Sequence, residues 1–197
     1  MDKKGILTKK RLIKETALHI KKNGIDNLSM RQIAGECNMS HTAIYRYFHS
    51  KADLINAVYP FIEKKAIDFL NKTLLANTSQ DPFSLFCKSY IRYMIKNPHD
   101  HYFLHFSPET RQIYPNETLF WKNLLMISPL FIGFSAITEE NQAILLRLVF
   151  SILNGFIFLY NRKIVSCEDP IDDFVDSVLC KYVKPFLQEE AAPSFTK

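Results

Sequence analysis

The segment Leu28–Tyr59, LSMRQIAGECNMSHTAIYRYFHSKADLINAVY, decides the fold of this 197-residue chain. Ser29, Ser40 and Ser50 each precede a stretch that can be helical, and serine is a favoured N-cap residue. Asn38 lies between the first two stretches, and asparagine adopts the left-handed conformation of a tight turn with less strain than most residues. The segment therefore predicts a helix, a tight turn and a second helix in under twenty residues, followed by a longer helix.

The second of these helices, predicted over 41–48, has two different sides. At about 100° per residue, Ile44 and Phe48 share an inward face, whereas Thr42 and Arg46 point away from it. Two short helices joined by a tight turn have the geometry that places the second helix in the major groove of DNA. The pattern therefore predicts a helix-turn-helix in which this helix reads base edges.

Polar side chains on and around this helix are the candidate DNA contacts. Arg and Thr can contact base edges, Tyr hydroxyls suit phosphate oxygens, and the N-terminal N–H groups of helices bind phosphate. The candidates are Ser29, His41, Thr42, Tyr45, Arg46, Tyr47 and Lys51. For the two tyrosines, the alternative is burial with the hydroxyl bonded to protein. Cys37 is expected to be a packed thiol under the turn.

The distribution of charged and aromatic residues changes near residue 60, just after this segment. Residues 1–60 carry eleven Lys and Arg against five Asp and Glu, whereas fifteen of the sixteen Phe lie beyond residue 60. A basic head on a near-neutral, aromatic body is typical of a polyanion-binding module joined to a body with another task. The alternative for the head alone is an ordinary lysine-rich surface.

The stretch from Ile6 to Tyr59 resembles the DNA-binding domain of TetR-type (TetR/AcrR family) transcriptional regulators. The family pattern reads [ST]-[MV]-x-x-I-A before the turn and S-x-x-x-[IL]-Y-x-[YH]-F-x-[SN]-K-x-x-L after it. The matching residues are Ser29, Met30, Ile33, Ala34, Ser40, Ile44, Tyr45, Tyr47, Phe48, Ser50, Lys51 and Leu54.

The resemblance also assigns roles. It implies DNA contacts from Ser29, Thr42, Tyr45, Tyr47 and Lys51, with His41 at a variable, base-reading position, and Arg46 is added from the helical wheel alone. The chain departs from the family at Asn38, where glycine is usual, and at Ala43, where Thr or Ser is frequent. No contact is therefore carried over to Ala43.

The whole chain reads as all-α, because apolar residues recur at three- and four-residue spacing and Gly and Pro are few. The expected helices cover about 8–23, 30–37, 41–48, 51–75, 82–97, 99–106, 117–136, 139–164 and 170–187, with Thr138 and Asp169 as caps of the last two. We expect an N-terminal three-helix helix-turn-helix DNA-binding domain at 1–55. A larger helical ligand-binding and dimerisation domain follows at 56–197.

The last two long helices are more apolar than a single body needs, which favours burial against a second copy. The resemblance implies the same homodimer, built as a four-helix bundle from these helices. A two-fold dimer would place its two reading helices about 34 Å apart on a palindromic operator.

An aromatic surplus in the middle helices is expected to form core, or to line the apolar cavity in which TetR-like proteins hold an inducing small molecule. The candidate pocket residues are Phe86, Tyr90, Tyr93, Phe103, Phe120, Trp121, Arg147, Phe150 and Asn154. Arg147, if buried, would need a partner or an anionic ligand group.

Other classes have less support. His99, His101 and His105 are the one metal-like group, but their spacing dictates no further ligand, so neither a metal nor a cofactor is expected. No catalytic constellation is recognisable, which predicts a non-enzyme. The apolar run 143–160 contains Arg147 and Asn154, which disfavours a membrane span. Four dispersed Cys and a charged N-terminus favour the cytoplasm.

The predicted function is that of a sequence-specific transcriptional regulator, a repressor by resemblance, released from its operator by a small molecule. One alternative is an activator that is ligand-independent or regulated by a protein. Another is a helical small-molecule-binding protein or enzyme whose basic head is incidental.

Overall fold

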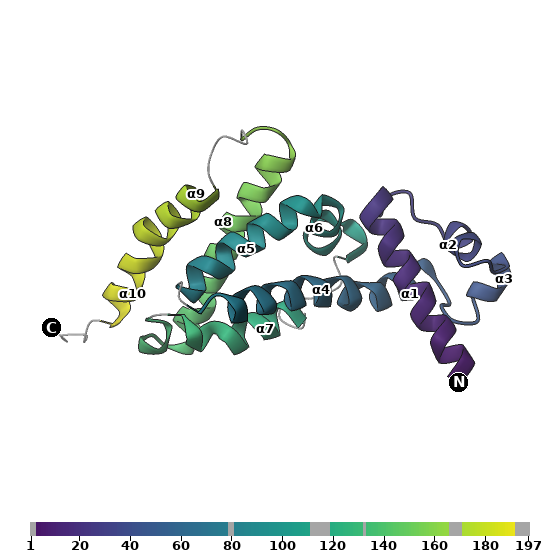
Figure 1. The fold of residues 1–197 in the computed structure, drawn as a ribbon, viewed down its shortest axis with the longest axis horizontal. Helices are drawn as coiled ribbons and strands as arrows, with labels where there is room; N and C mark the ends of the chain where they lie inside the picture. The colour runs from purple at the N-terminus through teal and green to yellow at the C-terminus, as the bar shows by residue number, and fades with distance from the viewer. Residues whose placement is uncertain (1–2, 79–80, 111–118, 132, 166–170, 192–197) are drawn as a thin grey trace. The chain divides into compact units, whose positions relative to one another are not determined.

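The computed structural model describes residues 3–78, 81–110, 119–131, 133–165 and 171–191. These residues form helices, turns and loops without a strand (Figure 1). The expected all-α fold is therefore confirmed. The contacts divide the chain into two compact units: Met1–Ile67 with Asn97–Trp121, and Asp68–Lys96 with Lys122–Lys197.

The first unit contains the N-terminal helices and a later insertion. Its elements are α1 (Lys3–Asn23), α2 (Met30–Glu36), α3 (His41–Ile44), the first part of α4 (Lys51–Ala76), α6 (Pro98–His105) and the 3-10 turn η1 (Pro108–Thr110). α1 packs against both α2 and α6, and α2 packs against α3. The fully buried side chains of this core include Leu12, Ile20, Ile25, Ile33, Ile44, Phe48 and Leu54. α1 therefore forms the base on which the helix-turn-helix rests.

The second unit holds the remaining helices. Its elements are the end of α4, α5 (Pro82–Lys96), most of α7 (Leu119–Ile127), the 3-10 turns η3 (Ser128–Leu130) and η4 (Phe134–Ala136), α8 (Glu139–Asn161), α9 (Ile171–Val178), the π-helical turn η5 (Leu179–Val183) and α10 (Lys184–Ala191). α5 packs against both α8 and α9, and α10 packs against η4. Thr138 caps α8 as expected, because its side chain accepts the N–H of Asn141 at 3.2 Å.

Several expected helices differ from those observed. α1 begins at Lys3, earlier than residue 8. The single helix expected over 117–136 is wrong, because α7 ends at Ile127 and is followed by two 3-10 turns, the second preceded by Gly133 at φ +86°. Pro129, which lies in the first of these turns, cannot donate the backbone hydrogen bond that a continuing helix needs.

The helix expected over 170–187 is interrupted by the π-helical turn, whose wider backbone lies between α9 and α10. Its expected cap, Asp169, lies outside the described residues.

α8 is long and apolar enough to cross a membrane by length and composition alone, and one side of it is buried within its unit. Its buried residues include Leu145, Leu153 and Ile157. Asn154 is also buried, and its side chain accepts a hydrogen bond from the Tyr90 hydroxyl at 2.9 Å and donates to the Phe150 carbonyl at 2.8 Å. The polar group inside this apolar helix is therefore satisfied by protein.

The C-terminus of α8 is closed by a Schellman motif with a lysine in the left-handed position. Lys163 has φ +57°, its N–H donates to the Tyr160 carbonyl at 2.9 Å, and the N–H of Ile164 donates to the Leu159 carbonyl at 3.0 Å. A side chain with a Cβ is strained in this conformation. Glycine would be the unstrained residue.

We predict that Lys163→Gly unfolds at a higher urea concentration than Lys163→Ala, by about 0.5–1 kcal/mol in the free energy of unfolding. Alanine keeps the left-handed strain of about 1–2 kcal/mol, which outweighs the extra chain entropy that glycine loses on folding. Lys122, inside α7, is the matched control. At this helical position Lys122→Ala must be more stable than Lys122→Gly, because glycine is unfavourable inside a helix. Equal midpoints at position 163 would contradict the prediction.

Candidate DNA-binding interface

α2 begins and ends as the sequence predicts. The Ser29 hydroxyl accepts the N–H of Gln32 at 3.2 Å, which is one half of the expected capping box. After Glu36 the chain reverses through Asn38 at φ +54°, whose N–H donates to the Gly35 carbonyl at 2.9 Å, while the N–H of Met39 donates to the Ala34 carbonyl at 2.8 Å. This Schellman motif is the tight turn of the helix-turn-helix.

The segment 41–48, here named the reading segment, is α-helical over a shorter stretch than expected. α3 covers His41–Ile44 only, capped by the Ser40 hydroxyl, which accepts the N–H of Ala43 at 3.2 Å. Beyond it, the N–H of Arg46 donates to Ala43 and that of Tyr47 to Ile44, each across three residues. The N–H of Phe48 also donates to the Ile44 carbonyl at 3.1 Å, across four residues. The expected helix over 41–48 is therefore wrong in its second half, where bonds across three residues are mixed with this one α-helical bond and no regular α-helix continues.

Two buried side chains hold this segment in place. Ile44 and Phe48 are both 0% exposed, as the helical wheel predicts. Lys9 of α1 places its ammonium 5.0 Å from the centre of the Phe48 ring, in a cation–π contact. The reading segment is thus held by the burial of Ile44 and Phe48 and by the contact of Phe48 with Lys9 of α1.

The opposite side of the segment is exposed and polar. His41, Thr42, Tyr45 and Arg46 are all exposed, and Tyr47 is half-buried. The rings of His41 and Tyr45 meet edge to face with centroids 5.2 Å apart. These side chains form one hydrogen-bonding surface that no described part of the unit covers.

α1 is braced against α2 by a buried histidine. His19 places Nδ1 2.8 Å from Glu36 Oε1, and its Nε2 is buried without a hydrogen-bond partner. An imidazole that donates Nδ1–H to the carboxylate leaves Nε2 as an unprotonated acceptor, which costs less in an apolar surrounding than a buried N–H would. The brace sets the position of α2, and hence of the turn, on α1.

α4 begins with a reciprocal cap. The Ser50 hydroxyl accepts the N–H of Asp53 at 3.1 Å, and the Asp53 carboxylate accepts the N–H of His49 at 3.0 Å. Lys51, the first residue of α4, is the expected phosphate contact at this end of the interface. The capping fixes its backbone rigidly.

The side chain of Lys51 already has a partner within the unit. Its ammonium lies 3.5 Å from Glu109 Oε1, on the 3-10 turn that follows α6. The pKa of Glu109 is lowered, first by the Ser107 hydroxyl, which donates to its carboxylate at 2.7 Å, and also by Lys51. Sequence reasoning missed Glu109, because 58 positions separate it from Lys51 and no local motif marks the contact.

The nine expected pocket residues fall in different parts of the fold. Phe103, Phe120 and Trp121 belong to the first unit, whereas Phe86, Tyr90, Tyr93, Arg147, Phe150 and Asn154 belong to the second. Arg147 is exposed and Tyr93 is half-buried, while the aromatic rings of Phe86, Phe120 and Trp121 are buried. Nothing in these positions singles out a ligand.

The aromatic cluster of the second unit is closely packed. Phe83, Phe86, Leu124 and Phe150 help to line a cavity of only about 10 Å³, which is at most the room for one water molecule. Phe83 lies against Phe131 with ring centroids 4.5 Å apart. An effector in this part of the second unit would have to displace these rings.

The histidine group does not form a metal site in the described part of the chain. His101 is buried, and its ring centroid is 5.5 Å from that of His105. Burial, together with His101, lowers the pKa of His105 to about 3, so that this imidazole is neutral at pH 7. The neutral ring of His105 packs against the ring of His101.

A buried helix-turn-helix scaffold with an exposed polar reading segment defines a DNA-binding protein of the helix-turn-helix class. Residues 12–58 match the family model "Bacterial regulatory proteins, tetR family". The match covers the helix-turn-helix and the helices next to it, so this segment of the chain is of the tetR-family type.

The fold of the chain is similar to that of a solved structure. A possible TetR family transcriptional regulator from Streptomyces coelicolor A3(2) aligns over 93% of this chain and 96% of its own, with a TM-score of 0.55 and 16% sequence identity. At this identity the likeness concerns the fold. No curated protein matches the chain significantly.

We predict that Glu109→Gln binds DNA about 2- to 5-fold more tightly than the parent at low salt. The substitution releases Lys51 from a competing carboxylate, and partly exposed ion pairs of this kind contribute about 0.2–1 kcal/mol. Glu139→Gln is the matched control, because it removes one exposed acid from the start of α8 and changes the net charge equally. Titration of a labelled duplex measures both, and an equal gain in the two variants would show a general charge effect instead.

Proposed function

We propose that this protein is a homodimeric, cytoplasmic repressor that binds a palindromic operator and leaves it when a small molecule occupies its C-terminal domain. The observation that carries the DNA-binding part is the exposed polar face of the reading segment above the buried pair Ile44 and Phe48. The sign of regulation and the effector rest on resemblance to the TetR family.

The proposed contacts divide into base readers and phosphate clamps. His41, Thr42 and Arg46 are exposed on the segment that would enter the major groove, and their side chains can contact base edges. Ser29, Tyr45, Tyr47 and Lys51 would contact phosphates around the groove. Tyr47, being half-buried, has only its outer part available.

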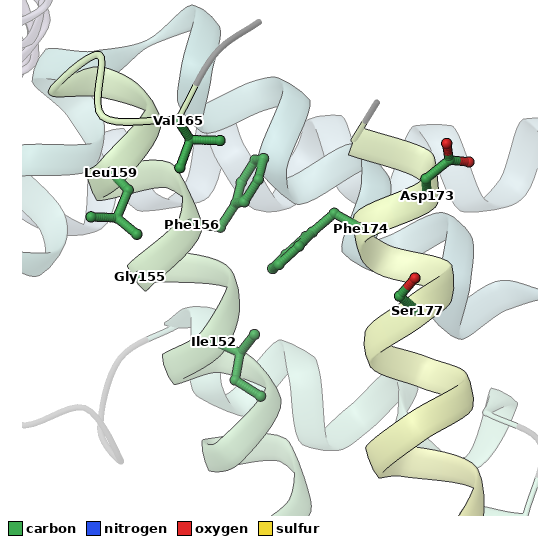
Figure 2. A pocket seen from close by; sticks show the side chains of 8 residues that line it. All are labelled: Ile152, Gly155, Phe156, Leu159, Val165, Asp173, Phe174 and Ser177. Carbon is green, nitrogen blue, oxygen red and sulfur yellow. The ribbon is translucent and has the colours of Figure 1, made fainter. Parts of the chain in front are cut away.

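Dimerisation is proposed through α8 and α9. α8 carries an exposed apolar stripe, Ile144, Leu148, Gly155 and Leu159, on the face that its own unit leaves uncovered. Beside it, α8 and α9 border an open apolar groove of about 590 Å³, in which Phe156 and Phe174 stack with centroids 4.2 Å apart (Figure 2). Apolar surface of this kind supports burial against a second copy.

Regulation would follow from a coupling between two binding equilibria. A small molecule that prefers a conformation in which the two reading segments are wrongly spaced must weaken DNA binding, and DNA must weaken its binding by the same factor. The packed aromatic cluster supports a closed resting state in which ligand entry requires rearrangement. We propose no catalytic step and no cofactor.

The test of the DNA contacts begins with the DNA upstream of the protein's own gene, compared with a scrambled duplex at about 50 and 200 mM salt. Lys51→Ala should weaken binding of the dimer to all sequences and reduce the salt slope by about 1.8, which is about 0.9 for each of the two phosphates that are no longer neutralised. His41→Ala and Thr42→Ala should instead change the preferred bases in a selection from random DNA.

Lys122→Ala is the control for Lys51→Ala, because it removes an exposed lysine from α7. An unchanged salt slope for Lys51→Ala removes Lys51 from the interface. A base preference identical to the parent's in both His41 and Thr42 variants would contradict the reading role of α3.

The dimer interface is tested by Leu148→Asp, which places a charge in the middle of the proposed contact. We expect a monomer by light scattering at micromolar concentration, and at least about a tenfold loss of affinity for a palindromic site but not for a half-site. Leu125→Asp, at an exposed leucine of α7, should leave the dimer intact. A dimer that survives Leu148→Asp would place the interface elsewhere.

A further inference from the structure

We propose that the basic face of α1, formed by Lys10, Arg11 and Lys14, is a second DNA-binding surface that binds phosphates of the duplex flanking the operator. This inference rests on the proposed DNA binding and extends it beyond the helix-turn-helix. The three side chains line an open groove of about 640 Å³ along α1, together with Leu7, Thr8 and Glu15.

Charge is the first argument. Lys10, Arg11 and Lys14 are exposed, and none of them forms an ion pair with a carboxylate in the described part of the chain. Glu15 is the one acid in the groove, which leaves an excess of two positive charges there. An uncompensated cationic surface is complementary to a polyanion.

Continuity with the helix-turn-helix is the second argument. Lys9, next to Lys10, lies against the Phe48 ring at the end of the reading segment. At the turn, burial raises the pKa of the Cys37 thiol while Arg11 lowers it, so the guanidinium of Arg11 acts electrostatically on the turn itself. α1 therefore meets the end of the reading segment through Lys9, and Arg11 of the basic face acts on the turn that precedes the segment.

The spacing of the cations fits a DNA strand. Lys10 and Lys14 are separated by one helical turn, about 6 Å along the axis, and phosphates of one strand recur about every 3.4 Å along the duplex. Because the strand also winds about the duplex axis, neighbouring phosphates lie farther apart than this rise, and the separation of the two cations corresponds to about one phosphate step. Lys21, further along α1, differs, because it acts within the unit: burial raises the pKa of Asp100, and Lys21 partly opposes this rise.

The experiment compares two duplexes that carry the same operator, obtained by selection from random-sequence DNA with the full-length protein. The short duplex ends at the operator, and the long one adds about eight base pairs of unrelated sequence at each end. The test variant is Lys10→Ala/Arg11→Ala/Lys14→Ala, in which alanine preserves helix propensity. The control is Lys72→Ala/Lys122→Ala/Lys181→Ala, which removes three exposed lysines from α4, α7 and the π-helical turn.

We expect the parent and the control to bind the long duplex at least about 5-fold more tightly than the short one. The test variant should bind both duplexes equally, and its salt slope on the long duplex should fall by about 0.9 for each phosphate that it no longer neutralises. Unchanged circular dichroism and melting temperature would establish that the fold is intact.

Three results would overturn the inference. A test variant indistinguishable from the control leaves operator recognition standing and removes α1 from the interface. Equal losses of affinity on the short and long duplexes would place the binding surface inside the operator. If the parent selects no DNA sequence at all, the proposed function fails together with the inference.

Discussion

The burial of Ile44 and Phe48 is the constraint on which the DNA-binding surface depends. An isolated helix shorter than about 12 residues is marginal in water, and α3 has only four residues, so the reading segment cannot hold its shape by backbone hydrogen bonds alone. Its two apolar side chains, both 0% exposed, fix it to the α1 core instead. Because they are four residues apart, they leave Tyr45 and Arg46 exposed between them, with Tyr47 half-buried, and the polar face follows from the packing.

The same logic makes α1 the organising helix of the first unit. One side of it receives α2, through the pairing of His19 with Glu36, and another receives α6. Gly24 follows α1 at φ +79°, and a Cβ at this position would lie 3.2 Å from Nδ1 of His99, a residue of α6. A larger residue at position 24 would therefore press against α6. The helix-turn-helix and the later insertion are thus built on one shared support, although they are distant in sequence.

The helix-turn-helix was predictable because its caps and turn depend on residues close together in sequence. Features that depend on packing against distant residues were not predictable. Ser29, Ser40 and Ser50 all cap helices as expected, since an N-cap depends on residues no more than three positions away, and the family match at 12–58 confirms the class. The early end of α3 and the half-burial of Tyr47 were not predictable, because both depend on neighbours that a helical wheel does not contain. The expected domain boundary at residue 55 stays a prediction. The compact unit that contains the helix-turn-helix extends to Ile67 and includes residues 97–121, because α6 packs against α1.

The Lys51–Glu109 pair shows how this insertion can influence DNA binding without touching DNA. A DNA phosphate and the Glu109 carboxylate would compete for the Lys51 ammonium. Any event that moves η1 towards Lys51 would therefore strengthen the Lys51–Glu109 pair and weaken the contact of Lys51 with the phosphate. The competition is limited in size, because a partly exposed ion pair contributes only about 0.2–1 kcal/mol. In a symmetric dimer the effect applies twice, and the two contributions add in the free energy of operator binding. Such a contact therefore adjusts affinity over a modest range, while complete release of DNA requires displacement of the reading segments themselves.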